Sequence, residues 1–374
     1  MNLEAALAAA DRIATEVAGP NAPAVDRDAA FPTASIDALR AAGLLGLISA
    51  TEVGGSGLGL RAAALVVERL ARACGSTAMV TAMHYAGTAV IEKFGGIAVR
   101  SDIAAGRHLS TLAFSEVGSR SHFWAPLSTA TRNGDTVTLD GKKSWITSAH
   151  QATAFVWSSR PASAEGFSSI WLVPNPNAGL TVQGGFDGLG LRGNDSAPVH
   201  AAGVRIGAGN LLGEDGKGFD TMMGVVLPIF SVMNAACSIG LMEAAVIGAA
   251  GHCSAVKHEH LGSSLADLPT IRAYLARMKI RADATRCLWM DTLDALETGR
   301  ADAMLRVLEV KAAAGEAALE VTSTGMRVCG GAAYRKEVGV ERAFRDAQAA
   351  SVMAPTTDQA YDFIGKAVTG MPLF

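Results

Sequence analysis

The chain has 374 residues, more than one ordinary hydrophobic core accommodates, and this length suits two or three layers of structure around a shared interior. Hydrophobic residues make up 49% and charged residues 18%, so we expect much buried surface, part of it between the subunits of a homodimer or homotetramer. The net charge of -3 excludes the basic surface that nucleic acid or an anionic membrane attracts, which leaves small molecules as the expected partners.

The cysteines and the start of the chain bear on its location. Five cysteines without CxxC spacing favour free, buried thiols in a reducing compartment, which predicts a cytoplasmic protein. Residues 1–19, MNLEAALAAADRIATEVAG, are interrupted by charges and predict an amphipathic helix rather than a signal peptide. We expect no apolar run long and uncharged enough to span a bilayer.

Three successive segments differ in their hydrophobic period. Residues 1–110 have apolar residues at helical spacing, as in LRAAALVVERLARA, and predict an N-terminal helical domain. Residues 111–222 switch to short alternating runs separated by turns such as NGD and NPN, and predict a middle antiparallel β domain. Residues 223–374 return to long, Ala-rich helical runs and predict a C-terminal four-helix-type bundle. The expected fold class is therefore α+β.

Four blocks carry a resemblance to a known family. LAFSEVGSRS (112–121) is similar to the pattern YxxTEPxAGSD, and GKKSWITSA (141–149) is similar to G-x-K-x-W-I-T-N. GLGLRGNDSAPV (188–199) with NLLGEDGKGF (210–219) is similar to the strand and turn that close the family's β domain, and CGGAAYRKEVGVERAFRDA (329–347) is similar to GGxGYxxExPVERxxRDA. Any one block would be weak. The ordered set resembles the acyl-CoA dehydrogenase family of flavoproteins over nearly the whole chain.

The resemblance implies FAD as the cofactor. A flavin ring needs hydrogen-bond donors at its edges and a flat apolar group on one face, and Trp145 and Thr147 would supply both from the same side of a strand. The family's flavin-contacting positions are occupied by Ser115, Ser121, Trp145, Thr147 and Thr356. The positions that contact the pyrophosphate or adenosine are occupied by His258, Arg327, Gly330 and Gly331. Taken alone, Trp145 could equally be a core aromatic residue, and the glycine pair an ordinary helix end.

The base that the family uses is missing. Counting from Arg345 along the family pattern places the usual glutamate at Ala354, and a second subgroup's glutamate, on the first bundle helix, falls on Phe230. The arginine that commonly follows the second position is Ser231. Removal of the α-proton of an acyl thioester needs a base within hydrogen-bond reach, so a relocated base is expected.

Four side chains are candidates for that base: His122, Glu116, His84 and Asp358. Glu116 belongs to the family motif and is more typical of a structural role, and Asp358 is expected to cap the last helix. His84 lies on an apolar helix, where core histidines are common, although a histidine there can line the flavin pocket. His122 stands where the motif usually has aspartate and is the first choice, with His84 second.

The resemblance implies an oxidoreductase that acts on the α,β carbons of an acyl thioester linked to CoA or to a carrier protein. Its electrons would pass to an electron-transfer flavoprotein or another acceptor. Two alternatives stay open. One is a flavin-dependent monooxygenase on the same fold, a type that dispenses with the glutamate and often uses histidines. The other is a non-catalytic flavin-binding partner subunit.

Overall fold

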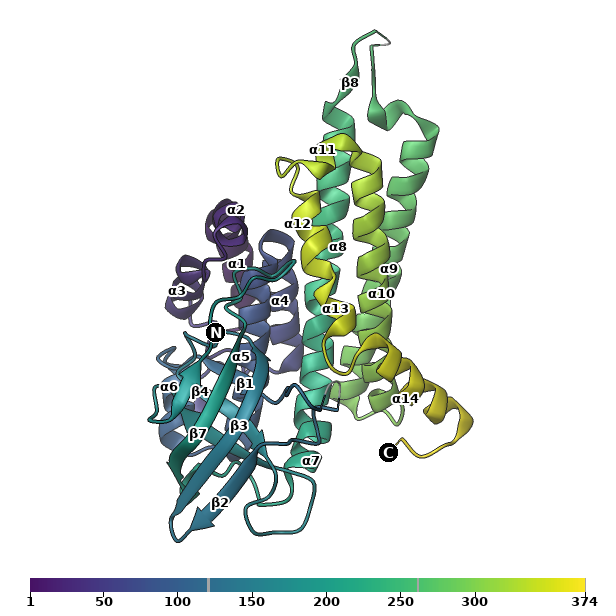
Figure 1. The fold of residues 1–374 in the computed structure, drawn as a ribbon. Coiled ribbons are helices and arrows are strands. Elements are labelled where there is room, and N and C mark those ends of the chain that lie inside the picture. Colours follow the sequence, from purple (N-terminus) through teal and green to yellow (C-terminus); the bar gives the residue numbers. More distant parts are fainter. Residues whose placement is uncertain (120–121, 261, 374) are drawn as a thin grey trace.

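The computed structural model describes residues 1–119, 122–260 and 262–373. Helices come first, strands follow and helices return, so the α+β fold class is confirmed (Figure 1). The first helices are α1 (Leu3–Ile13), α2 (Gly19–Arg27), α3 (Thr33–Ala41), α4 (Leu60–Ala73), α5 (Gly75–Phe94) and α6 (Ile97–Ala104). The break between α4 and α5 falls at Cys74, whose extended backbone ends one helix while its sulfur accepts a hydrogen bond from Thr77 N at 3.5 Å.

The middle of the chain forms two sheets that share one core. The strands are β1 (Ser110–Ala113), β2 (Thr129–Asn133), β3 (Thr136–Ile146), β4 (Ala154–Ser159), β5 (Ser169–Pro174), β6 (Leu180–Val182) and β7 (Ala197–Gly207). One sheet has the order β1-β4-β5 and the other β2-β3-β7-β6. Trp157 and Trp171 of the first sheet pack in the same buried cluster as Val137 and Leu139 of the second.

The expectation of a purely antiparallel domain is wrong for one strand pair. β1 runs parallel to β4, with Ser110 opposite Ala154. Between these two strands the chain makes the β2–β3 hairpin in the other sheet, so it returns to β1 in the same direction. A pairing between distant segments leaves no trace in local alternation.

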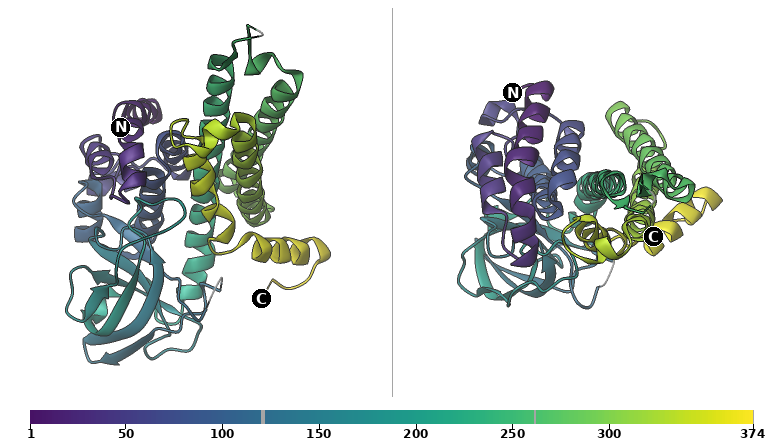
Figure 2. Two further views of the ribbon diagram at one scale, coloured as in Figure 1. Left: turned by 45° about the horizontal axis from the view of Figure 1, so that its top comes forward. Right: turned by 90° about the horizontal axis from the view of Figure 1, so that it is seen from above.

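The last part of the chain is a bundle of long helices that stands beside the N-terminal helices (Figure 2). Its elements are α7 (Gly218–Thr221), α8 (Leu227–Ala255), β8 (Lys257–His258), β9 (Ser263–Ser264), α9 (Pro269–Thr298), α10 (Ala303–Cys329), α11 (Gly331–Tyr334), α12 (Val340–Ala347), α13 (Ala349–Val352) and α14 (Thr357–Thr369). We keep residues 1–110, 111–222 and 223–374 as proposed domain limits.

The expectation that no apolar run is long enough to span a bilayer is wrong for the central helix of the bundle. The continuous helical stretch Gly218–Ala255 is long and apolar enough, by length and composition, to cross a membrane. In its most apolar window, however, 89% of the residues are buried inside the protein. Its apolar surface is therefore used for packing, mainly against α4, α5, α9 and α10.

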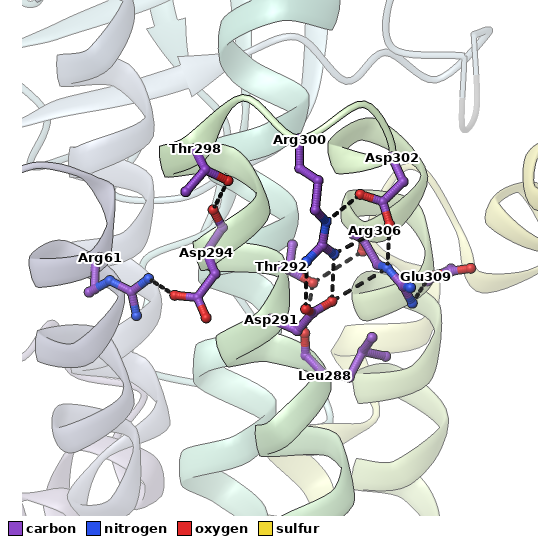
Figure 3. A network of polar contacts seen from close by, with 10 residues as sticks. All are labelled: Arg61, Leu288, Asp291, Thr292, Asp294, Thr298, Arg300, Asp302, Arg306 and Glu309. Atoms are coloured by element: carbon purple, nitrogen blue, oxygen red, sulfur yellow. Dashed lines mark hydrogen bonds and ion pairs between the residues drawn. The ribbon is translucent and has the colours of Figure 1, made fainter.

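Ion pairs join the N-terminal helices to the bundle and fix the turn between α9 and α10 (Figure 3). Arg61 of α4 lies 2.5 Å from Asp294 of α9. At the turn between α9 and α10, Arg300 bridges Asp291 and Asp302 at 2.7 and 2.5 Å. Such half-exposed pairs contribute little singly, but together they define how the two helices meet.

Candidate functional site

Trp145 and Thr147 lie at an irregularity of the β domain, not on one face of a regular strand. The pairing of β3 with β7 shifts between Lys143 and Ile146, and the backbone of Trp145 takes a φ of 60°. Trp145 is 73% exposed, whereas Thr147 is buried with its hydroxyl 3.5 Å from that of Ser196. The alternative of a core tryptophan is therefore wrong, whereas the same-side placement of Trp145 and Thr147 stays a prediction. A large flat ring held outward on a strained backbone offers a wall for a planar ligand.

The loop that contains Ser115 and Glu116 is held by hydrogen bonds to β3 and to Ser128. Ser115 O accepts a hydrogen bond from Ser144 N at 2.9 Å, which joins the two proposed flavin-contacting blocks. The buried carboxylate of Glu116 accepts bonds from Lys143 Nζ at 2.5 Å and from Ser128 Oγ at 2.6 Å. Burial opposes its charge, but the Lys143 ammonium and these bonds hold the pKa of Glu116 below its ordinary value. Glu116 is therefore a structural anchor. Ser121 lies outside the described residues.

His84 is a satisfied core histidine. Its side chain is fully buried, Nδ1 accepts a hydrogen bond from Ser110 N at 3.1 Å, and Nε2 donates to Leu45 O at 2.8 Å. Burial lowers the pKa of His84 to about 4, so the ring stays neutral at physiological pH. Because both ring nitrogens are occupied, the placement of His84 contradicts its candidacy as the base.

His122 lies on an exposed loop that packs toward the last helix. Its ring centroid is 4.9 Å from that of Trp124, and the Trp124 ring is 5.8 Å from Phe363 of α14. His122 itself is exposed. The loop after the Glu116 anchor therefore reaches the end of the bundle that contains residues 353–357.

The segment that carries the base in relatives lies at the start of α14. Ala354 is partly buried against the main core. Thr356 is the N-cap residue of α14, and its hydroxyl accepts a hydrogen bond from Gln359 N at 3.3 Å. The expectation that Asp358 caps this helix is therefore wrong. Asp358 is exposed in the first helical turn, where its charge still favours the helix N-terminus.

A small, partly open cavity lined mostly by buried residues lies next to this segment, and sequence reasoning missed it. It is lined by Met79, Leu191, Asn234, Cys237, Ser238, Leu241, Asp346, Ala349, Ala350 and Met353. Asp346 Oδ1 accepts a hydrogen bond from Leu191 N at 2.6 Å, and burial raises the pKa of Asp346 to about 6. Asn234 Nδ2 lies 3.3 Å from Met353 Sδ. The signal that could have revealed the cavity is the run SVMNAACSIG, in which polar residues interrupt an otherwise apolar helix.

The second set of proposed cofactor residues lies at the far end of the bundle. His258 belongs to β8, and Arg327, near the end of α10, stacks its guanidinium 4.9 Å from the Tyr274 ring. Gly330 has a φ of 57°, and a Cβ added at Gly330 or Gly331 would have nothing within 4 Å among the described residues. This backbone can therefore be approached closely by a ligand.

One protomer does not bring the two sets together. The β domain and α14 lie near one end of α8, and β8 and α11 lie at the other (Figure 1). The 29 residues of α8, at about 1.5 Å of rise each, span about 40 Å. The length of α8 thus separates β8 and α11 from α14.

Comparison with known proteins places the chain in a family. "Acyl-CoA dehydrogenase, N-terminal domain" matches residues 2–104, the corresponding middle domain matches 111–204, and the C-terminal domain matches 216–369. The mitochondrial short-chain specific acyl-CoA dehydrogenase of Homo sapiens is 31% identical over 350 residues, which cover 91% of this chain and 83% of that protein. This chain belongs to the acyl-CoA dehydrogenase family.

Other members of the acyl-CoA dehydrogenase family are similar over the full length. The cyclohex-1-ene-1-carbonyl-CoA dehydrogenase of Geobacter metallireducens is 28% identical over 373 residues, which cover 96% of this chain and 95% of that protein. The butyryl-CoA dehydrogenase structure from Megasphaera elsdenii superposes with a TM-score of 0.91 at 24% identity and covers 98% of each chain. The chain is therefore an FAD-dependent oxidoreductase of acyl thioesters, as the motifs indicate.

The described residues fit FAD on two independent grounds. At one end the exposed Trp145 ring is available to cover a flat ring system. At the other end the open backbone of Gly330 and Gly331 leaves room for a dinucleotide.

Proposed function

We propose that this chain removes hydrogen from the α,β carbons of an acyl thioester, carried by CoA or by a carrier protein, with His122 as the relocated base. Bound FAD supplies the two-electron acceptor. The observation that carries the proposal is that two of the other candidates are held by partners. Glu116 is paired with Lys143, and both ring nitrogens of His84 are bonded. Asp358 is exposed in the first turn of α14, where its charge favours the helix N-terminus.

Each residue of the proposed site has a separate task. Trp145 covers one face of the flavin ring, while Ser115, Ser121, Thr147 and Thr356 offer polar groups near its edges. The Glu116–Lys143 pair holds the loop that presents His122. A base works best when water is excluded, so we expect the bound thioester and the neighbouring loop to cover the now exposed His122 ring.

We propose that the complete FAD site needs two protomers. Because His258, Arg327, Gly330 and Gly331 lie by β8 and α11, at the end of α8 away from the β domain and α14, we expect one cofactor to meet both sets only if a second protomer contributes one of them. This supports a homodimer or homotetramer. We also propose a cytoplasmic location and transfer of the electrons to an electron-transfer flavoprotein or a similar acceptor.

Anaerobic flavin reduction tests the proposed reaction. The purified protein is mixed with a panel of saturated acyl thioesters, and bleaching of the flavin absorbance is followed in wild type, His122→Ala and the control His200→Ala, a partly exposed histidine on β7. We expect bleaching by one class of thioester. His122→Ala should slow it by about 10²-fold or more at unchanged FAD content, whereas His200→Ala should not.

Two results would contradict the proposal in different ways. Full activity of His122→Ala would show that His122 is not the base. Reduction by an added reductase only, followed by oxygen consumption, would indicate the monooxygenase alternative.

A further inference from the structure

The cavity beside Met353 has a polar lining on one helix. Ser231, Asn234 and Ser238 of α8 are spaced as i, i+3 and i+7, which places them on one face of the helix. Their side chains are 0%, 3% and 1% exposed. Asn234 and Ser238 line the cavity itself.

These buried polar atoms have acceptor capacity that the protein does not use. Ser231 Oγ, Asn234 Oδ1 and Ser238 Oγ have no hydrogen-bond partner among residues 1–119, 122–260 and 262–373. Leaving a buried polar group without a partner costs about 1–3 kcal/mol, so native proteins rarely retain several together without an occupant that satisfies them. An amide oxygen such as Asn234 Oδ1 accepts only, and therefore requires a donor.

The cavity adjoins the segment that matches the position of the base in relatives. Asn234 contacts Met353, which directly precedes Ala354, the position that matches the base of relatives. Ala349, Ala350 and Asp346, which precede that position in the chain, are also part of the lining. The space open to water is about 10 Å³, roughly the room of one water molecule or one small polar group.

We propose that the substrate's acyl group carries a hydroxyl or amino group beyond its β-carbon, and that this group donates a hydrogen bond to Asn234 Oδ1, with Ser238 Oγ as the second contact. The inference rests on the proposed function, because it assigns the substrate class of the same site. A short polar acyl thioester satisfies the lining, whereas an unsubstituted alkyl chain of equal length leaves Asn234 Oδ1 unpaired. Asn234 is thus a specificity-determining residue.

Equilibrium binding to the FAD-loaded protein tests this. The probes are pentanoyl, 4-hydroxybutyryl and 4-aminobutyryl thioesters, which have equal numbers of heavy atoms in the acyl group and are offered on CoA and on pantetheine. Binding is read from the anaerobic shift of the flavin spectrum and from the thermal unfolding temperature. We expect wild type to bind the hydroxyl or the amino probe at least about tenfold more tightly than pentanoyl, and the better of the two identifies the donor.

Substitutions test whether the binding preference for the polar probes depends on the cavity residues. Asn234→Leu, of similar size but without the acceptor, should abolish or reverse the preference, and Ser238→Ala should weaken it. Ser254→Ala on the exposed end of α8, where the hydroxyl bonds Ala250 O, is the matched control and should keep it. Should Asn234→Leu not fold, the wild-type ranking of the three probes still decides.

The outcomes separate this inference from the proposed function. If wild type binds pentanoyl as tightly as the polar probes, the polar atoms hold a buried water only and the inference is wrong, while flavin bleaching by any thioester leaves the proposed function intact. If no thioester on either carrier shifts the spectrum or the unfolding temperature, both are overturned.

Discussion

The buried amine of Lys311 allows the cost of burying an unpaired charge inside the bundle to be tested. It lies on α10 with its side chain fully buried, and its Nζ has no hydrogen-bond or ion-pair partner among the described residues. It precedes Gly315 by one helical turn on the same face, and a Cβ at Gly315 would lie 3.3 Å from Thr357 Oγ1. The amine therefore belongs to the packed face that supports the start of α14. We predict that Lys311→Met, which fills similar space without a charge, stabilises the protein.

The magnitude follows from the pKa of the amine. Burial lowers the pKa of Lys311 from 10.5 to about 8, and this difference corresponds to about 3 kcal/mol. Below pH 8 the amine is protonated in the folded and unfolded chain alike, so the full penalty acts on the folded state. Between pH 8 and 10.5 the unfolded chain holds a proton that the folded chain has lost, and the wild-type free energy of unfolding rises with pH. Lys311→Met should be more stable by about 3 kcal/mol at pH 7, and its advantage should vanish near pH 10.5.

Urea unfolding at fixed protein concentration, followed by tryptophan fluorescence at several pH values from 7 to 10.5, measures this difference. The buried Glu116–Lys143 pair, in which burial lowers the pKa of Lys143 to about 8, titrates in both proteins, so subtraction isolates Lys311. Lys93→Met, at an exposed lysine of α5, is the control and should change stability by less than about 0.5 kcal/mol. A less stable Lys311→Met, with no pH-dependent difference from wild type, would show that the amine is paired in the folded protein and would refute the reasoning.

Three further substitutions test the cofactor and the reacting centre. Trp145→Ala should weaken FAD binding about tenfold in a titration, with little change in apoprotein stability because the ring is 73% exposed, and Phe167→Ala, at a 68% exposed ring, should leave FAD affinity unchanged. Gly330→Ala should reduce the FAD content of the purified protein, whereas Gly299→Ala, which has a similar positive φ but the left-handed helical backbone that alanine tolerates at lower cost, should keep its FAD. Ala354→Glu should create or increase anaerobic flavin reduction by a saturated acyl thioester, because a carboxyl buried there has a raised pKa. If Ala354→Glu shows no flavin reduction with any thioester that binds, the result favours the monooxygenase alternative.

The order of helices and strands could be predicted because each segment keeps one hydrophobic period. The run that becomes α8 is apolar except for a few polar residues such as Ser231, Asn234 and Ser238, and it is the central helix of the bundle. What local patterns could not show was pairing between distant segments. The parallel contact of β1 with β4 depends on where the chain returns, and the register shift that exposes Trp145 depends on β7.

In the candidate site, too, local motifs could be predicted from the sequence, whereas contacts between distant segments could not. Motif order was enough to identify the family and FAD, because each block has a fixed place relative to the ligand. The roles of single titratable residues were not accessible in this way. His84 is occupied by Leu45 O and Ser110 N, from segments far away in the sequence, and Glu116 is fixed by Lys143 on another strand. Burial and partners decide whether such a group can accept a proton, and both are properties of the folded chain.

The cavity also bears on whether the protein is a catalyst or a non-catalytic flavin-binding subunit. The departures from the family at Phe230, Ser231 and Ala354 lie close to the polar face of α8 and to Met353. A chain released from binding a substrate would gain stability by replacing Asn234 and Ser238 with apolar residues, since each unpaired buried polar atom costs about 1–3 kcal/mol. Retaining this cost at the inner end of the site, together with the cofactor-binding blocks, is consistent with a substrate that satisfies it. The retained polar atoms therefore favour altered specificity, rather than loss of function, as the reason why the usual glutamate is absent.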